Sequence, residues 1–144
     1  MQTNVIVKTH EIALKGRNRP WFMQRLVDNL RQATRGTGVE QVWQGRLLVG
    51  LTLRDEADWP LVSERVKDCF GVAKFFKAHK LPPDLEKVKD ILPSLLTDRS
   101  FESFRITANR ADKRFPSTSE EINRDLGRFV QDITGSRVDL THPD

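Results

Sequence analysis

The sequence predicts an α+β fold built in two parts, and three features of its 144 residues support this prediction. Stretches in which apolar and polar residues alternate, as in half-buried strands, are interspersed with stretches that repeat an apolar residue every three or four positions, as in amphipathic helices. The paired prolines Pro82 and Pro83 mark a linker, because proline suits neither a helix interior nor a central strand. Apolar residues make up 38% of the chain, which is enough for a hydrophobic core.

The first predicted strand covers residues 4–9, where two valines point to one side. A helix follows, which Asn18 and Pro20 open, because proline is tolerated in a first helical turn. Glycines at positions 36 and 38 end this helix. We expect it to bury apolar residues spaced by three or four positions: Phe22, Leu26, Leu30 and Ala33.

Two further strands, at residues 39–43 and 46–53, are predicted to flank a turn at Gln44-Gly45. The second of these strands has the clearest alternation in the chain, with apolar residues on one face: Leu47, Val49, Leu51 and Leu53.

A second helix is expected to begin at Asp58 and to end at Gly71, with one apolar face: Val62, Val66, Cys69 and Phe70. A strand at residues 72–80 then completes the order β-α-β-β-α-β. This order is the split βαβ or ferredoxin-like arrangement, in which two helices cover one face of an antiparallel sheet. We therefore assign residues 1–80 to a ferredoxin-like domain.

The second part, residues 81–144, is predicted to contain two helices and a strand. Asp84 opens the first helix, which we expect to kink or break at Pro93 and to align four apolar residues: Leu85, Val88, Leu92 and Leu95. A strand follows in which Phe104, Ile106 and Ala108 alternate with polar residues. Two overlapping capping boxes, Ser117 with Glu120 and Thr118 with Glu121, precede a helix that Gly135 closes. This helix is expected to bury Ile122, Leu126, Phe129, Val130 and Ile133.

One convincing strand cannot make a sheet, so this second part is expected to be incomplete at its C-terminal end. Either it borrows a sheet edge, as a homodimer would allow, or the chain is a piece of something longer. We favour the second explanation.

Composition excludes several classes of protein. No apolar run approaches the roughly 18 residues of a membrane span. The N-terminus has no basic segment followed by an apolar one, as a secretory signal would. Cys69 is the only cysteine and lies far from the three histidines, so we expect neither a disulfide nor a metal site, and a cytoplasmic location fits.

Positive charge is concentrated in three blocks, although the net charge is only +4. Residues 1–35 hold seven basic and two acidic residues, residues 71–80 three and none, and residues 99–115 five and two. Arginine supplies 15 of the 24 cations, which favours bidentate phosphate contacts. A polyanionic partner is the natural inference, although modest charge segregation is also common in proteins without one.

Two stretches place cations beside the start of a helix. Lys15, Arg17 and Arg19 surround Gly16 ahead of the first helix, where free backbone N–H groups also favour an anion. The alternative is a solvated loop in which Asn18 acts only as a cap. The second stretch, residues 104–117, carries three cations into a loop before a helix, and two arginines follow one turn apart: Arg110, Lys113, Arg114, Arg124 and Arg128. Phosphate binding competes here with a salt-bridge network that involves Asp112 and Asp125.

At these residues the sequence resembles a known family. Residues 11–19, EIALKGRNR, resemble the EIxLKGxNR signature that opens the tRNA 4-thiouridine synthetases, also called thiamine-biosynthesis sulfurtransferases or the ThiI family. Residues 104–116 and 119–127 resemble the core of the THUMP domain of that family. The resemblance implies a ferredoxin-like domain and a partial THUMP α/β domain that together grip tRNA, so that a PP-loop domain can thiolate uridine 8.

The same resemblance implies that the chain itself is not an enzyme, because no stretch matches the SGGxDS loop of the PP-loop domain, which uses ATP and Mg. We expect no cofactor in this chain. Cys69 lies on an apolar helix face and is expected to be a core thiol. Glu11 and Asp112 lie among cations, which keeps carboxylates ionised and makes them poor general acids. Aromatic residues are candidates either for base stacking or for packing: Trp21, Trp43, Trp59, Phe75 and Phe76.

The sequence therefore predicts a tRNA-binding module that recognises folded RNA by shape and phosphate contacts. The expected RNA-binding residues are Lys15, Arg17, Arg19, Arg110, Lys113, Arg114, Arg124 and Arg128. They would have to converge into one continuous surface in the folded chain. Two alternatives remain: a THUMP module of another RNA-modifying enzyme, or a ferredoxin-like domain that binds a protein or a small anion.

Overall fold

The computed structural model describes residues 2–10, 15–110 and 112–144, and it divides the chain into two compact units, residues 1–80 and 81–144. Each unit is a separate body with its own sheet. Within the described ranges, no helix is long and apolar enough to cross a bilayer.

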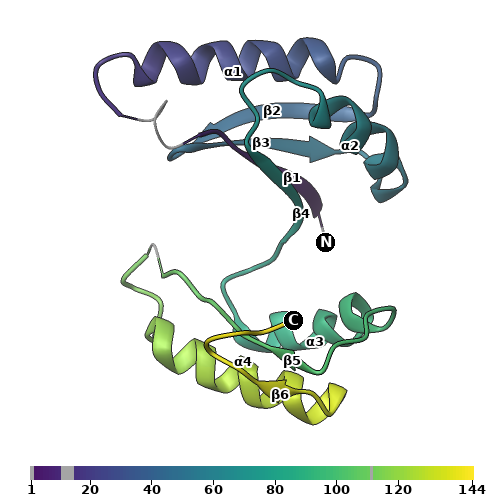
Figure 1. Cartoon of the computed structure of the whole chain (residues 1–144), viewed down its shortest axis with the longest axis vertical. Coiled ribbons are helices and arrows are strands. Elements are labelled where there is room, and N and C mark those ends of the chain that lie inside the picture. Colours follow the sequence, from purple (N-terminus) through teal and green to yellow (C-terminus); the bar gives the residue numbers. More distant parts are fainter. Residues whose placement is uncertain (1, 11–14, 111) are drawn as a thin grey trace. The chain divides into compact units, whose positions relative to one another are not determined.

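The first unit has the predicted βαββαβ order (Figure 1). Its elements are β1 (Gln2–Lys8), α1 (Arg19–Ala33), β2 (Val39–Gly45), β3 (Leu48–Leu53), α2 (Trp59–Lys67) and β4 (Lys74–Lys80). The strands lie in the order β2-β3-β1-β4, and every neighbouring pair is antiparallel. This topology confirms the ferredoxin-like prediction.

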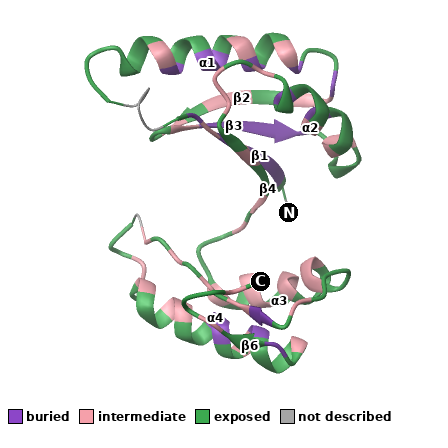
Figure 2. Ribbon diagram, in the orientation of Figure 1, coloured by how far each residue is buried: buried purple, intermediate pink, exposed green. Residues whose placement is uncertain are grey.

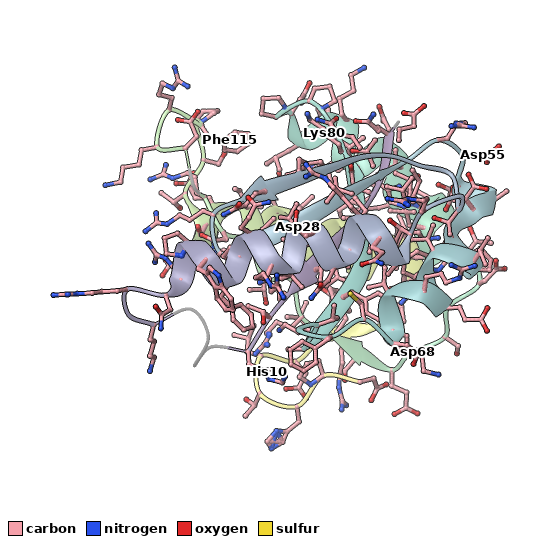
Figure 3. The ribbon with its side chains drawn as sticks, turned by 90° about the horizontal axis from the view of Figure 1, so that it is seen from above. His10, Asp28, Asp55, Asp68, Lys80 and Phe115 are labelled. Atoms are coloured by element: carbon pink, nitrogen blue, oxygen red, sulfur yellow. The ribbon has the colours of Figure 1, made fainter. Side chains whose placement is uncertain are left out.

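The core of this unit lies between one sheet face and the two helices (Figure 2). Valines and leucines of β1 and β3 pack there against apolar residues of α1 and α2: Val5, Val7, Val49, Leu51, Leu53, Met23, Leu26, Val27, Leu30, Val62 and Val66. Asp28 lies on the outward side of α1 (Figure 3). The opposite face of the sheet carries no helix of this unit (Figure 1).

Several local predictions for this unit were wrong. The buried stripe of α1 includes Met23 and Val27, whereas Phe22 and Ala33 are only half-buried, because the helix is rotated relative to the expected stripe. The hairpin turn lies after Gly45, so that Leu47 is in the turn with a φ of 60° and is exposed.

The second helix also differs from its prediction. It ends at Lys67, so Phe70 falls outside its apolar face and is 82% exposed. Neither Asn18 nor Asp58 makes a side-chain cap bond, because both have helical backbone angles at those positions. Asp55 instead accepts a hydrogen bond from the Ala57 N–H at 2.9 Å and begins a short 3₁₀ turn.

The second unit contains α3 (Leu85–Leu96), β5 (Ser103–Phe104), α4 (Ser119–Thr134) and β6 (Arg137–Val138). The strands β5 and β6 pair in parallel, so this unit has a second strand that the sequence analysis missed. A two-residue strand carries too little alternation to be recognised in a sequence. The predicted alternation of residues 104–109 between half-buried and exposed positions is present, although only Phe104 at its start pairs as a strand.

Both helices of this unit have predicted caps, although α4 uses only the Thr118 box of the two that the sequence offers. Asp84 accepts a hydrogen bond from the Glu86 N–H, and Thr118 and Glu121 form a capping box. Gly135 ends α4 with a φ of 74°. We expected a kink or a break at Pro93, and a break is excluded because α3 continues through Pro93 to Leu96. Hydroxyls support its last turn, since Thr97 donates to the Pro93 carbonyl at 2.7 Å.

Candidate nucleic-acid interface

The first basic cluster, Lys15, Arg17 and Arg19, leads into α1, and all three side chains are exposed. The first turn of α1 contains no acidic residue, so none there neutralises these cations. Asn18 makes no side-chain cap bond, and its structure therefore differs from the alternative in which it acts only as a cap. These features leave the start of α1 open to an anion. Residues 11–14 of the signature, including Glu11, lie outside the described residues.

Gly16 lies within this cluster and has a φ of 89°, a conformation that favours glycine. A Cβ built at this position would meet no described atom within 4 Å. Because Gly16 has no side chain, a phosphate could approach the protein backbone closely at this position.

Arg110, in the second basic stretch, is half-buried and holds the loop before α4. Its guanidinium Nη1 donates to the carbonyls of Phe115, at 3.3 Å, and of Ser117, at 3.4 Å. These two bonds fold the loop back on its own start and place residues 112–114 at its outer end. Phosphate binding by Arg110 stays a prediction. The structure shows in addition that Arg110 stabilises the loop before α4 through these two hydrogen bonds.

Asp112 and Arg114 form a two-bond ion pair at the outer end of the loop. Arg114 Nη2 lies 3.0 Å from Asp112 Oδ2, and Arg114 Nε lies 3.1 Å from Asp112 Oδ1. These bonds hold the pKa of the Asp112 carboxyl below its ordinary value, which confirms that this carboxylate stays ionised. A phosphate would have to replace Asp112 to make bidentate contacts with Arg114.

The other predicted RNA-binding cations of this unit, Lys113, Arg124 and Arg128, are exposed on the loop and on α4. Arg124 Nη2 lies 3.9 Å from Glu120 Oε2, and both side chains are solvated. No described acidic side chain lies within 4 Å of the amine of Lys113 or the guanidinium of Arg128. The expected salt-bridge network is only partly present, since Asp125 pairs instead with Lys89 on α3 at 2.9 Å.

Asn123 positions this surface, and the sequence analysis did not single it out. Its Oδ1 accepts a hydrogen bond from the Ala108 N–H at 2.7 Å, which ties the extended segment before the loop to α4. Arg124 and Arg128 line a depression of about 480 Å³ beside Asn123. The sequence gives one indication of this role, a polar asparagine among the apolar positions of α4. The neighbouring capping box had accounted for the polar residues of this segment.

The two clusters belong to different units of the chain, Lys15, Arg17 and Arg19 to the first and the remaining cations to the second. Their convergence into one surface therefore stays a prediction. Within its own unit each cluster is basic, and all of its cations except the half-buried Arg110 are exposed.

The aromatic candidates fall into separate groups. Trp59 and Phe75 pack against the core of the first unit, with ring centroids 6.1 Å apart, so packing explains both. Trp21 is 64% exposed on α1 and has the Arg25 guanidinium 5.5 Å from its ring centroid. Trp43 and Phe76 lie on the helix-free face of the sheet, because they alternate with residues that face the core.

Covalent and metal chemistry have little support among the described residues. Cys69 packs against the core, and burial raises the pKa of its thiol, as expected for a structural cysteine. Within the described ranges, no group of three or more histidine, cysteine or acidic side chains is placed to hold a metal ion.

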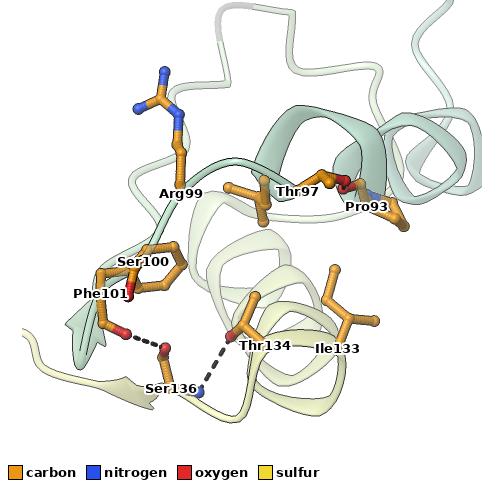
Figure 4. Close-up of a pocket in the computed structure, with 9 residues that line it drawn as sticks. Pro93, Thr97, Arg99, Ser100, Phe101, Ile133, Thr134 and Ser136 are labelled. Carbon is orange, nitrogen blue, oxygen red and sulfur yellow. Dashed lines mark hydrogen bonds between the residues drawn. The ribbon is translucent and has the colours of Figure 1, made fainter.

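A polar hollow of about 340 Å³ lies in the second unit between the end of α3 and the end of α4 (Figure 4). Ser136 donates from its hydroxyl to the Phe101 carbonyl, and its N–H donates to Thr134 Oγ1 at 3.2 Å. Arg99 points away from these groups. The Ser136 hydroxyl thus joins the residue before β6 to the segment before β5.

Comparisons with known proteins identify both units. Residues 4–75, half of the chain, match the ThiI ferredoxin-like domain, and residues 82–144 match the THUMP domain. The chain is 46% identical over 143 residues to a probable tRNA sulfurtransferase of Thermus thermophilus, and 35% identical over 147 residues to one of Moorella thermoacetica. It covers 97% and 100% of itself in these matches, but only 34% and 37% of those relatives.

Two solved structures have the same fold. A 4-thiouridine synthetase, crystallised as an RNA complex with bound ATP, superposes with a TM-score of 0.82 at 26% identity, over the whole of this chain and 37% of that one. The protein PH1313 from Pyrococcus horikoshii superposes with a TM-score of 0.80 at 24% identity, over 99% of this chain and 48% of that one. The domain matches and the fold together show that this chain belongs to the ThiI family, of which it contains the ferredoxin-like and THUMP domains.

Proposed function

We propose that this chain is the tRNA-binding part of a tRNA sulfurtransferase, and that it grips structured tRNA through phosphate contacts. The observation that carries the proposal is an exposed basic cluster in each of two domains that occur together in this family. The named relatives, tRNA sulfurtransferases and a 4-thiouridine synthetase bound to RNA, support tRNA as the ligand.

The contacts to phosphate follow from the geometry of an RNA duplex. An A-form helix hides its base edges in a deep, narrow groove, so a protein reads it through shape, 2′-hydroxyls and phosphates. Lys15, Arg17 and Arg19 present charges beside the start of α1, and Lys113, Arg124 and Arg128 present charges on the second unit. These exposed cations would release counterions from the RNA when they bind.

The proposal also places the chain in a reaction. The chain spans about a third of the length of the curated relatives it matches. In the whole protein, the two domains would hold the tRNA while a PP-loop domain, using ATP and Mg, thiolates uridine 8. We also propose, as the sequence allows, that two copies of the chain can associate as a homodimer. The match of residues 4–75 to the ThiI ferredoxin-like domain favours this enzyme over other enzymes that carry a THUMP domain.

Charge reversal tests the phosphate contacts. In gel shifts with full-length tRNA at several salt concentrations, Arg17→Glu and Lys113→Glu should each weaken binding and flatten the dependence of log K on log salt by about 0.9 for each lost contact. Lys113 is preferable to Arg110 here, because Arg110 also holds its loop.

Arg35→Glu is the matched control, since Arg35 is exposed beyond the opposite end of α1, about 22 Å along the helix axis from Arg19. It should leave the salt dependence unchanged. Equal slopes for the wild type and both test variants would contradict the proposal. An acceptor minihelix and a single-stranded RNA in the same series distinguish recognition of folded RNA from general affinity for polyanions.

A further inference from the structure

The helix-free face of the first unit carries an ordered set of side chains. We call it the open sheet face, and its strand positions follow from the pairing register: Gln2, Asn4, Ile6, Lys8, Gln41, Trp43, Leu48, Gly50, Thr52, Lys74, Phe76, Ala78 and Lys80. Two rows cross all four strands, Gln41–Thr52–Asn4–Ala78 and Trp43–Gly50–Ile6–Phe76. A depression of about 450 Å³ lies over the first row and over Trp43 and Ile6 of the second, and Phe76 lies outside its lining.

Trp43 is held flat on this face by its neighbours. A Cβ at Gly50 would lie 2.0 Å from Trp43 Cζ2, so the ring rests directly on the backbone of β3. The indole Nε1 donates to Thr52 Oγ1 at 3.2 Å, and that hydroxyl donates to Asn4 Oδ1 at 2.8 Å. Both polar partners are buried. A glycine and a buried hydrogen-bond chain thus fix one ring face and leave the other side of the half-buried ring toward the depression.

Phe76 lies at the other end of the same row and is 45% exposed. Its row is three strand spacings wide, or about 14 Å. The surface between the two rings is narrow and mixed, with the half-buried Ile6 beside Asn4. Two separated rings, with amide side chains in the neighbouring rows of the face, suit planar, polar groups better than a continuous apolar partner.

The charges of this face are all positive. Lys8 and Lys74 are directly opposite each other on β1 and β4, an arrangement that destabilises a sheet unless an anion lies between them. Lys80 pairs in register with Gln2 at the other end of β4. None of the strand positions of the open sheet face is acidic. Glu40, at the bulge of β2, faces Arg54 at 4.0 Å.

We propose that the open sheet face binds unpaired nucleotides of RNA. One base stacks on the outer side of Trp43 and another on Phe76, the Gln41 and Gln2 amides meet base edges, and Lys8 with Lys74 holds a phosphate. Stacking on aromatic rings beside a basic surface is how proteins bind single strands. This site is distinct from the two cation clusters, and it rests on the proposed function only in that its ligand is RNA.

The test uses the complete chain with its tryptophan indoles labelled with nitrogen-15. Three indole N–H signals are expected, from Trp21, Trp43 and Trp59, and Trp→Phe variants assign them. A single-stranded RNA of six nucleotides should shift the Trp43 signal and leave that of the core residue Trp59 in place. A blunt duplex of the same sequence should shift Trp43 much less, because its bases are not free to stack.

Matched variants connect this signal to the proposed contacts. Phe76→Leu and Lys74→Ala should each weaken binding of the hexanucleotide, by about fivefold or more for the stacking ring. Phe70→Leu and Lys67→Ala are the controls, since both residues are exposed and lie outside the open sheet face. All four changes affect exposed side chains, so the fold should survive, and circular dichroism checks this.

An unmoved Trp43 signal, or equal losses in test and control variants, would overturn the proposal. A change of molecular mass in light scattering with Phe76→Leu, without a change in RNA affinity, would show that a protein covers this face and would overturn it as well. Arg17→Glu and Lys113→Glu should weaken binding of full tRNA but hardly affect the hexanucleotide. If the hexanucleotide does not bind at Trp43 but these two variants still weaken binding of tRNA, only this inference fails. If the two variants leave tRNA binding unchanged but the hexanucleotide shifts Trp43, only the proposed function fails.

Discussion

The ion pair between Asp112 and Arg114 makes the stability of the second basic stretch depend on pH. The pKa of Asp112 lies below its ordinary value of 3.8 because Arg114 donates hydrogen bonds to the carboxylate. The stability from this pair is present above the ordinary value and is lost as the pH falls through the lowered pKa. A carbon-13 titration should place the Asp112 midpoint below 3.8, and Arg114→Ala should return it to about that value. A midpoint that is the same in both proteins would show that the ion pair does not persist in solution.

Two glycines should respond in opposite directions to the same substitution. Gly50→Ala should destabilise the chain by about 1–3 kcal/mol, because its Cβ would overlap the Trp43 ring. Gly127→Ala should stabilise it by about 0.5–1 kcal/mol, since Gly127 is helical and a Cβ there meets only Val138 Cγ2, at 3.7 Å. Urea unfolding measures both changes, and destabilisation by Gly127→Ala would contradict the room for a Cβ beside Val138.

At these positions the sequence predicts whether a side chain is exposed better than it predicts which groups that side chain contacts. The cations at 15, 17 and 19 are exposed, as a loop before a helix suggests. The partners of Arg110 could not be predicted, because they are backbone carbonyls of its own loop. The register that places Trp43 on Gly50 depends on pairing between strands, which alternation within one strand does not specify.

At the scale of elements, the capping box of α4 is a local feature, and one of the two boxes that the sequence predicts is present. Thr118 and Glu121 exchange hydrogen bonds at the start of the helix. Thr118→Ala should therefore cost about 1 kcal/mol of stability. Ser117→Ala is the matched control, because Ser117 makes no such bond with Glu120 and should change stability far less. Equal costs in thermal unfolding would indicate that the second overlapping box forms in solution.

The elements with strong alternation or complete caps were predicted, whereas those fixed by tertiary packing were not. The strand β3 and the four-strand order follow from the alternation of apolar residues and from the glycines and prolines that separate the elements. The helix α2 is shorter than its apolar spacing suggests, since it ends at Lys67 and leaves Phe70 exposed. The strand β6 is held by pairing with β5, and a two-residue strand has no period of its own.

At the scale of the whole molecule, the two units differ in how much apolar surface they bury. Eleven buried apolar residues form the core of the first unit, whereas only Leu126 and Val130 are buried apolar residues among those described in the second. Hydrogen exchange should therefore be slowest in β1 and β3 and faster in α3 and α4. Equal protection of α4 and β3 in mass spectrometry would mean that a further contact covers the second unit in solution.

The short connection between β4 and α3 gives the molecule a property that neither unit has alone. Only four residues, Leu81 to Asp84, separate Lys80 from Leu85, and two of them are prolines with restricted backbones. A tether of this length extends to at most about 14 Å. If both units bind the same RNA, as proposed, the unit that binds second meets that RNA at a high effective concentration, and the two contacts together give a higher affinity than either alone. Lengthening this tether with glycine and serine would lower this effective concentration. The affinity for tRNA should therefore fall, although no contact between the protein and the RNA would change.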